Sequence, residues 1–205
     1  MKKAIIYDWD GTLCNSIPAA FMATQSIFEL HCVPPPTFET YIGTFGPPYT
    51  SFYWENGLPR TVTEEQIWLH YMECSLHAEA DLFEEVFETI CTQRSYGYAI
   101  GLVTGQRISV LNTLMQKHKC SGLFDCIFAE TNPSKVSAFR DACKVLNVPP
   151  AETYSVGDFA TDMRDSVLAG VIPVGIVRST QDVSHLLMQA GAKKIIRTIS
   201  ELPIQ

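Results

Sequence analysis

Long apolar runs and an excess of basic charge are both missing from this 205-residue sequence. No apolar stretch approaches the roughly 20 residues that a transmembrane helix needs, so a membrane protein is not expected. The net charge is −7, which disfavours bulk attraction to nucleic acid or to an anionic membrane surface. The basic start at residues 1–3 leads into an apolar run that Asp8 and Asp10 interrupt, which is not typical of a signal peptide. We therefore expect a cytoplasmic protein with neither nucleic-acid nor membrane partners.

Paired cysteine spacing is also missing. The seven cysteines are an odd number, and no two of them lie in C-x-x-C spacing. A disulfide framework or a zinc site is therefore not expected, and scattered thiols are typical of a reducing cytoplasm. With 46% hydrophobic and 18% charged residues, the composition is that of a globular protein with a substantial core. The length allows one large domain, or one domain that carries a smaller insertion.

Basic residues are almost absent from positions 16–88, which contain eleven acids and a single base, Arg60. The remainder of the chain has eleven acids and fourteen bases. Solvated acidic helix faces account for most of this difference. The same segment lacks strand signals, so we expect a helical domain at 16–88, inserted into a core domain formed by 1–15 and 89–205.

Local signals mark the helices of this insertion. Ser16 is a plausible N-cap with Pro18 in the first turn, and Thr63 with Gln66 forms a capping box. Helices are expected at 17–30, 63–80 and 83–94. The stretch TYIGTFGPPY, residues 40–49, is rich in glycine, proline and aromatic residues, and we expect a shaped loop there.

Strands and helices alternate in the remainder. Apolar runs predict strands at 4–7, 98–103, 126–129, 153–156, 171–177 and 194–196. Helical segments are expected between them at 108–117, 135–146, 161–169 and 183–190. This alternation predicts an α/β fold with a Rossmann-like parallel sheet covered on both faces.

Polar residues follow several of these strands at the point where each ends. They are Asp8 and Asp10, then Thr104 and Gly105, then Lys135 at the start of a helix, and finally Asp158 with Asp162. Aspartate and glycine are also common in turns, which is the alternative for the stretch from Asp8 to Gly11. For Lys135 the alternative is a surface lysine at a helix start. Because right-handed crossovers bring the carboxyl ends of parallel strands to one edge, we expect the groups to converge.

This set suits phosphoryl transfer. Magnesium prefers carboxylate and water oxygens, and Asp8 and Asp158 could supply the carboxylates. Thr104, Lys135 and the amide of Gly105 could hold the phosphate oxygens. An aspartate can act as the nucleophile through an aspartyl-phosphate, and a second carboxyl can act as general acid and base.

Four ordered segments, DWDGTLCNS, LVTGQ, Lys135 and VGDFATD, resemble the motifs of the haloacid dehalogenase superfamily. The insertion after the first segment resembles the helical cap of that family, and residues 157–170 are especially similar to phosphoglycolate phosphatase-like members. The resemblance covers nearly the whole chain, and the cap matches least well.

The resemblance implies a role for each residue of these motifs. Asp8 would be the nucleophile and a magnesium ligand, and Asp10 the general acid and base with its backbone carbonyl on the metal. Thr104, Gly105 and Lys135 would bind the phosphoryl group. Asp158 would complete the metal site, and Asp162 would support it. An aspartate at position 10 argues against a true dehalogenase, because those enzymes lack this acid.

The chain departs from the family pattern at two places. Lys135 is followed by valine, where the family often has proline, and Gln106 follows Thr104 and Gly105 where Asn or Ser is frequent. We expect Gln106 to alter how the substrate is held.

Residues 43–48 correspond in place to the specificity loop of the family, so Thr44 and Phe45 are candidates for substrate contact. Arg60 could meet an anionic substrate, although an exposed surface position is favoured.

The expected function is a Mg2+-dependent phosphatase, acting as a monomer or homodimer on a small phosphorylated metabolite. The cap is expected to be mobile. Two alternatives remain open: a phosphomutase related to β-phosphoglucomutase, and a non-enzymatic phosphate-binding regulatory relative.

Overall fold

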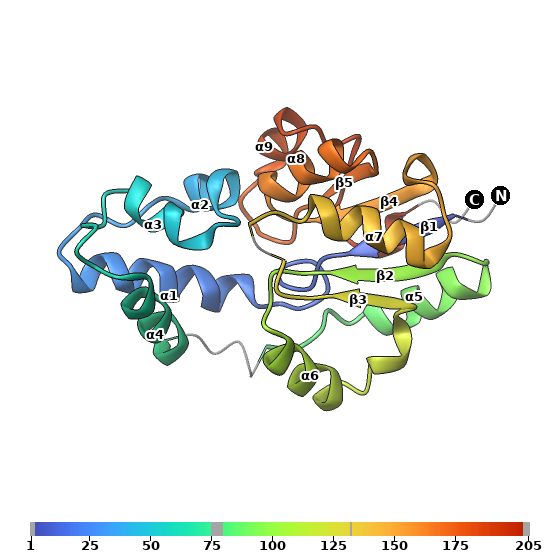
Figure 1. Ribbon diagram of the computed structural model, residues 1–205, viewed down its shortest axis with the longest axis horizontal. Helices are drawn as coiled ribbons and strands as arrows, with labels where there is room; N and C mark the ends of the chain where they lie inside the picture. The colour runs from blue at the N-terminus through green and yellow to red at the C-terminus, as the bar shows by residue number, and fades with distance from the viewer. Residues whose placement is uncertain (1–2, 75–79, 132, 203–205) are drawn as a thin grey trace.

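A six-stranded parallel sheet forms the centre of the computed structural model, which describes residues 3–74, 80–131 and 133–202. The strands lie in the order β3-β2-β1-β4-β5-β6 (Figure 1). Their bounds are β1 (Ala4–Tyr7), β2 (Ala99–Val103), β3 (Cys126–Phe128), β4 (Thr153–Gly157), β5 (Ile172–Ile176) and β6 (Lys194–Ile196). The predicted α/β fold is confirmed.

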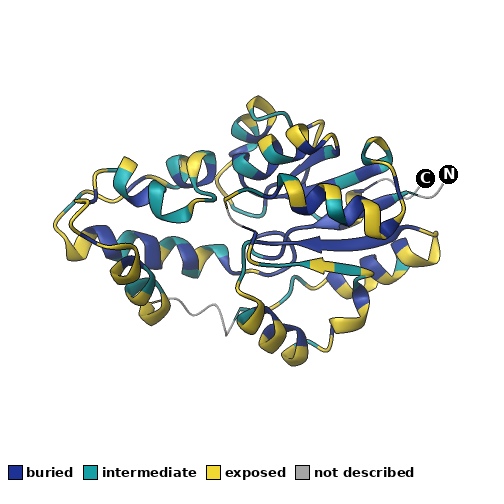
Figure 2. Ribbon diagram, in the orientation of Figure 1, coloured by how far each residue is buried: buried dark blue, intermediate teal, exposed yellow. Residues whose placement is uncertain are grey.

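Helices cover both faces of this sheet. Ile5 and Tyr7 of β1 face a core cluster that includes α5 (Val86–Ser95) and α6 (Ile108–Lys117). Ala4 and Ile6 face the opposite cluster, against α7 (Val136–Leu146) and the end of α8 (Ala160–Ala169). β1 is buried on both faces because it is central and alternates between these two clusters (Figure 2).

The segment between β1 and β2 is helical, with α1 (Ile17–Leu30), α2 (Phe38–Thr44), α3 (Tyr49–Glu55) and α4 (Glu64–Cys74). These helices form the part of the molecule on the left in Figure 1. Their apolar side chains share one cluster with Phe159, Met163 and Leu187, which belong to the sheet-covering part. Of these helices, α2 packs directly against α8 and α9 (Ser184–Gln189).

The chain leaves the sheet and returns to it along two adjacent segments. The Asn15 amide donates to the Asp81 carbonyl at 2.8 Å, and the Phe83 amide donates to the Leu13 carbonyl at 3.0 Å. Cys14 and Leu82 form an antiparallel bridge between them. The first crossing, at 13–15, ends directly before our proposed boundary at 16. The second, at 81–83, lies before the proposed boundary at 88, which falls within α5. The division into cap and core stays a proposal.

The expected loop at residues 40–49 is wrong, because α2 and α3 occupy most of it. The Thr37 hydroxyl caps α2 by accepting from the Thr40 amide at 3.1 Å, and α3 begins directly after Pro48. Tertiary packing of the aromatic side chains outweighs the weak helix propensity of this composition.

Other helix boundaries shift by a few residues. The helix expected at 83–94 begins at Val86, and α4 runs to Cys74. The predicted extension of that helix to residue 80 includes 75–79, which lie outside the described residues. The Thr63–Gln66 capping box is confirmed by reciprocal bonds of 2.9 and 3.3 Å.

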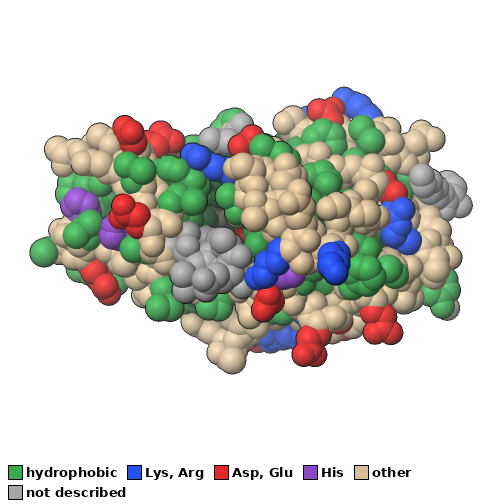
Figure 3. All heavy atoms as spheres, turned by 90° about the horizontal axis from the view of Figure 1, so that it is seen from below, with side chains coloured by type: hydrophobic (Ala, Val, Ile, Leu, Met, Phe, Trp, Pro, Cys, Tyr) green, Lys and Arg blue, Asp and Glu red, His purple; other side chains and the backbone are tan. Residues whose placement is uncertain are grey.

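Surface charge follows the imbalance in the sequence. On the face shown in Figure 3, lysine and arginine gather mainly over the sheet-containing half. All seven cysteines are free. Within the described residues, no helix is both long and apolar enough to cross a bilayer.

Candidate active site

The carboxyl ends of the three central strands bring the expected acids and the threonine together. Tyr7 pairs with Leu102 of β2 and with Val156 of β4. Asp8 is therefore level with the residues before Thr104 and Asp158, which follow one position further along their strands. Asp8 and Asp158 are 8% and 5% exposed. Such buried carboxylates need a cation or hydrogen-bond donors to offset their lost hydration.

A tight turn after β1 makes room for Asp158. Gly11 adopts a positive φ of 70°, and a Cβ added there would lie 2.0 Å from Asp158 Oδ2. Only glycine fits both the backbone conformation and this close approach. The Thr12 hydroxyl, one residue further, donates to Asp158 Oδ1 at 3.3 Å.

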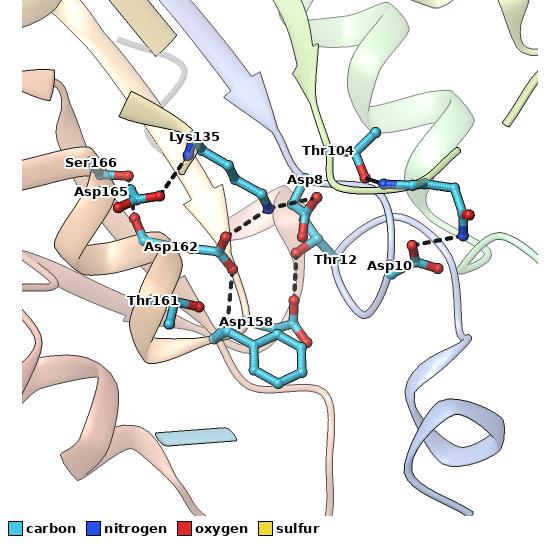
Figure 4. Close-up of polar contacts among 12 residues, drawn as sticks. Asp8, Asp10, Thr12, Thr104, Lys135, Asp158, Thr161, Asp162, Asp165 and Ser166 are labelled. Carbon is cyan, nitrogen blue, oxygen red and sulfur yellow. Dashed lines mark hydrogen bonds and ion pairs between the residues drawn. The ribbon is translucent and has the colours of Figure 1, made fainter. Parts of the chain in front are cut away.

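Lys135 lies at the centre of the group. Its Nζ is 3.0 Å from Asp8 Oδ1 and 2.7 Å from Asp162 Oδ1 (Figure 4). The residue is 4% exposed, so the alternative of a surface lysine is wrong. Burial opposes its charge, but Asp162 and Asp8 together raise the pKa of Lys135 well above its usual value. It therefore presents a positive charge beside the candidate nucleophile.

The start of α8 fixes this lysine. Asp162 Oδ2 accepts from the Phe159 amide at 3.1 Å while its Oδ1 holds Lys135. Asp165 accepts from the Lys135 backbone amide at 2.7 Å. Since both oxygens of Asp162 already have partners, this residue is suited to support Lys135.

Asp10 is held by two donors. The Ser16 hydroxyl donates to its Oδ1 at 2.6 Å, and Gln106 Nε2 donates to its Oδ2 at 3.1 Å. Ser16 occupies the N-cap position of α1 as predicted, but its side chain does not cap the helix and contacts Asp10 instead. Gln106 likewise reaches Asp10, and a contact with substrate stays a prediction for it.

Thr104 lies one residue beyond β2 and is 1% exposed. Its backbone amide donates to the Phe128 carbonyl at 2.9 Å, and its hydroxyl accepts from the Gln106 amide at 3.1 Å. The hydroxyl proton is therefore available to an acceptor in the site. This geometry suits the proposed contact with a phosphoryl oxygen, which stays a prediction for Thr104 and Gly105.

The acids present suit a divalent cation. Ligand atoms of Asp8, Asp158 and Asp162 lie within 4.8 Å of one another. Burial raises the pKa of Asp158 well above its usual value, and Asp162 and Asp8 raise it further. Burial likewise raises the pKa of Asp8, although Lys135 opposes that rise. Three buried carboxylates against this one ammonium leave excess negative charge, which magnesium held by Asp8 and Asp158 would offset.

Three expected substrate contacts lie in segment 16–88, which is called the cap segment below after its proposed role. Thr44 is exposed, donates to the Thr40 carbonyl at 2.7 Å and lines an outer groove of about 470 Å³ beside α8 and α9. Phe45 belongs to an aromatic cluster, and exposed Arg60 lies 5.3 Å from the centre of the Trp54 ring. None of the three takes part in the bonds around Asp8 and Asp10 described above, and their contact with substrate stays a prediction.

Tyr49 was missed by the sequence reasoning. A Cβ added to Gly105 would lie 1.6 Å from Tyr49 Oη, so the phenol lies directly on Gly105. The sequence placed Tyr49 directly after the expected specificity loop at 43–48. The direction of its side chain cannot be predicted from the sequence.

Comparison with known proteins agrees with this geometry. The family described as haloacid dehalogenase-like hydrolase matches residues 5–176. A phosphoglycolate phosphatase of Neisseria gonorrhoeae is 24% identical over 98% of this chain and 90% of its own length. The pyrophosphatase PpaX of Anoxybacillus flavithermus is 25% identical over 90% of this chain and 87% of its own length.

Solved structures share the fold. A haloacid dehalogenase-like family protein from Streptococcus pneumoniae superposes with a TM-score of 0.76 at 24% identity, over 95% of this chain and 93% of that one. A hydrolase from Pseudomonas syringae gives 0.75 at 21% identity, over 98% and 96%. With most of its length matched by the family and the acids of the motifs gathered at one sheet edge, the chain belongs to the haloacid dehalogenase-like hydrolases.

Proposed function

We propose that this hydrolase is a magnesium-dependent phosphatase that cleaves a small phosphomonoester through an aspartyl-phosphate on Asp8. The observation that carries the proposal is Lys135 Nζ, which lies between Asp8 and Asp162 at 3.0 and 2.7 Å in a buried site. A carboxylate nucleophile repels a phosphate dianion, and a fixed positive charge beside it reduces that repulsion.

The reaction divides into two displacements at phosphorus. In the first, Asp8 attacks the phosphoryl group, while Thr104, Gly105 and Lys135 hold its oxygens and Asp10 protonates the departing alkoxide. In the second, Asp10 takes a proton from water, which attacks the phosphoryl group and releases Asp8. Magnesium, held by Asp8, Asp158 and the Asp10 carbonyl, would neutralise charge on the phosphoryl oxygens.

Ser16 and Gln106 orient the acid and base of this scheme. Each donates to a different oxygen of Asp10, so the carboxyl group is held in one rotamer. A positioned acid avoids the entropy of finding its orientation during the reaction.

The relatives guide the choice of substrate. Their names include phosphoglycolate phosphatase and pyrophosphatase, so small phosphorylated metabolites are the class to test first. We propose that the enzyme works in the cytoplasm, since its seven free cysteines suit a reducing compartment. A monomer or a homodimer fits the proposal equally.

A phosphate-release screen tests this function. The panel contains sugar phosphates, nucleoside monophosphates, phosphoglycolate and pyrophosphate, each with magnesium and with a chelator. We expect release that requires magnesium, and trapping with beryllium fluoride should place the phosphate mimic on Asp8. No release from any substrate by folded, magnesium-loaded protein would refute the proposal. Isomerisation of a sugar phosphate through a bisphosphate would instead indicate a mutase.

A further inference from the structure

Tyr49 brings a hydroxyl from the cap segment into the phosphoryl-binding part of the site. It is the first residue of α3, and its Oη would lie 1.6 Å from a Cβ built on Gly105. Gly105 follows Thr104 in the loop expected to hold the phosphoryl oxygens. The absence of a side chain at Gly105 is what lets the phenol approach this loop.

The position of Tyr49 is fixed by contacts to the sheet-covering helices. The Thr161 hydroxyl of α8 donates to the Phe45 carbonyl at 2.9 Å. Gly46 lies so close to Thr161 that an added Cβ would meet its side chain at 2.6 Å. The Phe45 ring then packs against the Tyr49 ring at 5.3 Å and against Phe159 at 5.7 Å. The contacts from Thr161 to Phe45 and from Phe45 to Tyr49 therefore hold the phenol at Gly105.

One turn of α8 connects this chain to the catalytic group. Thr161 anchors the Phe45 loop, and the next residue, Asp162, holds Lys135 at 2.7 Å. The phenol and the ammonium are thus positioned by adjacent residues of a single helix.

The electrostatic surroundings keep this phenol neutral. Burial raises the pKa of Tyr49 above its usual value, while Lys135 lowers it and Asp8, Asp162 and Asp10 raise it. These four charged residues all belong to the proposed active site. A neutral phenol is a hydrogen-bond donor, which is what a phosphoryl oxygen accepts.

We propose that Tyr49 is a phosphoryl-binding residue, whose hydroxyl donates to a non-bridging oxygen of the phosphoryl group beside Thr104 and Gly105. The inference rests on the proposed phosphatase function and deepens it. The phosphoryl group occupies the same place in the ester and on Asp8, so the hydroxyl contributes to both displacements. The donor set is complete when α3 is docked, which links cap closure to the chemistry.

This assignment differs from a contact with the leaving group. A donor on the phosphoryl group affects every substrate alike, because all substrates share that group. A donor on the leaving group affects only those esters that carry an acceptor there. Comparing substrates with different leaving groups therefore distinguishes a contact with the phosphoryl group from a contact with the leaving group.

The test is Tyr49→Phe, which removes the hydroxyl and keeps the ring that packs on Phe45. Tyr53→Phe is the matched control, because Tyr53 lies on the same helix and its hydroxyl is 3.4 Å from Thr24 within the cap segment. The readouts are kcat/KM for p-nitrophenyl phosphate and for the best substrate of the screen, and the affinity for orthovanadate with magnesium, measured by calorimetry.

We expect Tyr49→Phe to weaken orthovanadate binding and to lower kcat/KM by about 10- to 100-fold, the usual effect of a hydrogen bond to a charged group. The loss should be equal for both substrates, with an unchanged melting temperature and near-normal kinetics in Tyr53→Phe. Unchanged orthovanadate affinity would overturn the inference, and so would a loss confined to one substrate. If the wild type releases no phosphate, the proposed function fails, but orthovanadate affinity still decides the role of Tyr49.

A second variant tests the contact itself. Gly105→Ala should displace the phenol and weaken orthovanadate binding, because its Cβ takes the space of Oη. In a Tyr49→Ala background the same substitution should cost much less, since the clash is gone. Equal losses in the two backgrounds would contradict the contact.

Discussion

Replacing Asp158 by asparagine should stabilise the protein without metal and remove most of the stabilisation by magnesium. Ligand atoms of Asp158 lie within 4.8 Å of those of Asp8 and Asp162. Two like charges at that separation repel by about 3.5 kcal/mol at an effective dielectric constant of 20. Lys135 offsets part of this repulsion through its contacts with Asp8 and Asp162.

We expect Asp158→Asn to raise the free energy of unfolding by about 1–3 kcal/mol in chelator, because relaxation reduces the Coulomb figure. The amide oxygen can still accept from Thr12, which keeps that contact. For a chain of this size each kcal/mol shifts the melting temperature by about 2–4 °C. The metal-free variant should therefore melt several degrees above the wild type.

Magnesium should reverse that order. A ligand at 100 times its dissociation constant stabilises by about 2.7 kcal/mol, so the wild type should gain about 5–10 °C. The variant should gain less than about 2 °C at the same magnesium concentration, because it has lost a ligand.

The metal-free difference should also depend on pH. The pKa of Asp158 is raised in the folded protein, so the folded state retains a proton that the unfolded chain releases. That contribution is fully present below the unfolded pKa and is lost as pH rises through the folded pKa. The advantage of Asp158→Asn in chelator should therefore grow as pH rises.

Differential scanning calorimetry in chelator and in magnesium measures all of these shifts. Asp141→Asn is the control, since Asp141 is a partly exposed acid paired with Lys144 at 2.7 Å, away from the site. It should keep the full magnesium shift of the wild type. A less stable Asp158→Asn in chelator, or equal magnesium shifts in the two proteins, would refute the reasoning.

Three further predictions concern turnover. Asp8→Asn should keep the fold and lose essentially all phosphate release, because the amide is no nucleophile; substantial release by the purified variant would contradict the mechanism. Asp10→Asn should lower kcat by about 100- to 10,000-fold, the usual contribution of a general acid and base. If the variant keeps the wild-type kcat for substrates with good and with poor leaving groups, Asp10 does not have that role. Esters with neutral leaving groups should show higher kcat/KM than phosphoglycolate. Segment 16–88 contains eleven acids and one base, Arg60, so its negative charge disfavours a substrate with a second anionic group. A preference for phosphoglycolate that is lost in Arg60→Ala would show that Arg60 binds the second anion.

The position of the site could be predicted from local sequence. Short apolar runs that alternate with helical segments are typical of the buried strands of a parallel sheet, and polar residues directly after them lie at its carboxyl edge. Asp8, Thr104 and Asp158 were placed in this way, and the register of β1 with β2 and β4 puts Thr104 and Asp158 one residue beyond the level of Asp8. Gly11, directly after Asp10, is also predicted from sequence to form a turn, although its contact with Asp158 is not.

Tertiary structure decided which side chains meet across long sequence separations. Lys135 is 127 residues from Asp8, and its burial depends on Asp162 and on the packing of α7 and α8. Ser16 stands at the position of a helix N-cap, but in the folded chain its hydroxyl donates to the nearby carboxylate of Asp10. A hydrogen bond to a charged acceptor is stronger than one between neutral groups.

The cap segment shows most clearly the difference between what local sequence predicts and what tertiary packing determines. Glycine, proline and aromatic residues at 40–49 have weak local preferences, so aromatic packing determines α2 and α3. Tyr41 and Phe45 pack against Phe159, and Phe52 packs against Phe45. The reach of Tyr49 to Gly105 depends on that packing and on the Thr161 anchor. Local sequence determines where strands end and carboxylates emerge because those are short-range effects of burial. Which side chain then occupies the space above them depends on long-range packing.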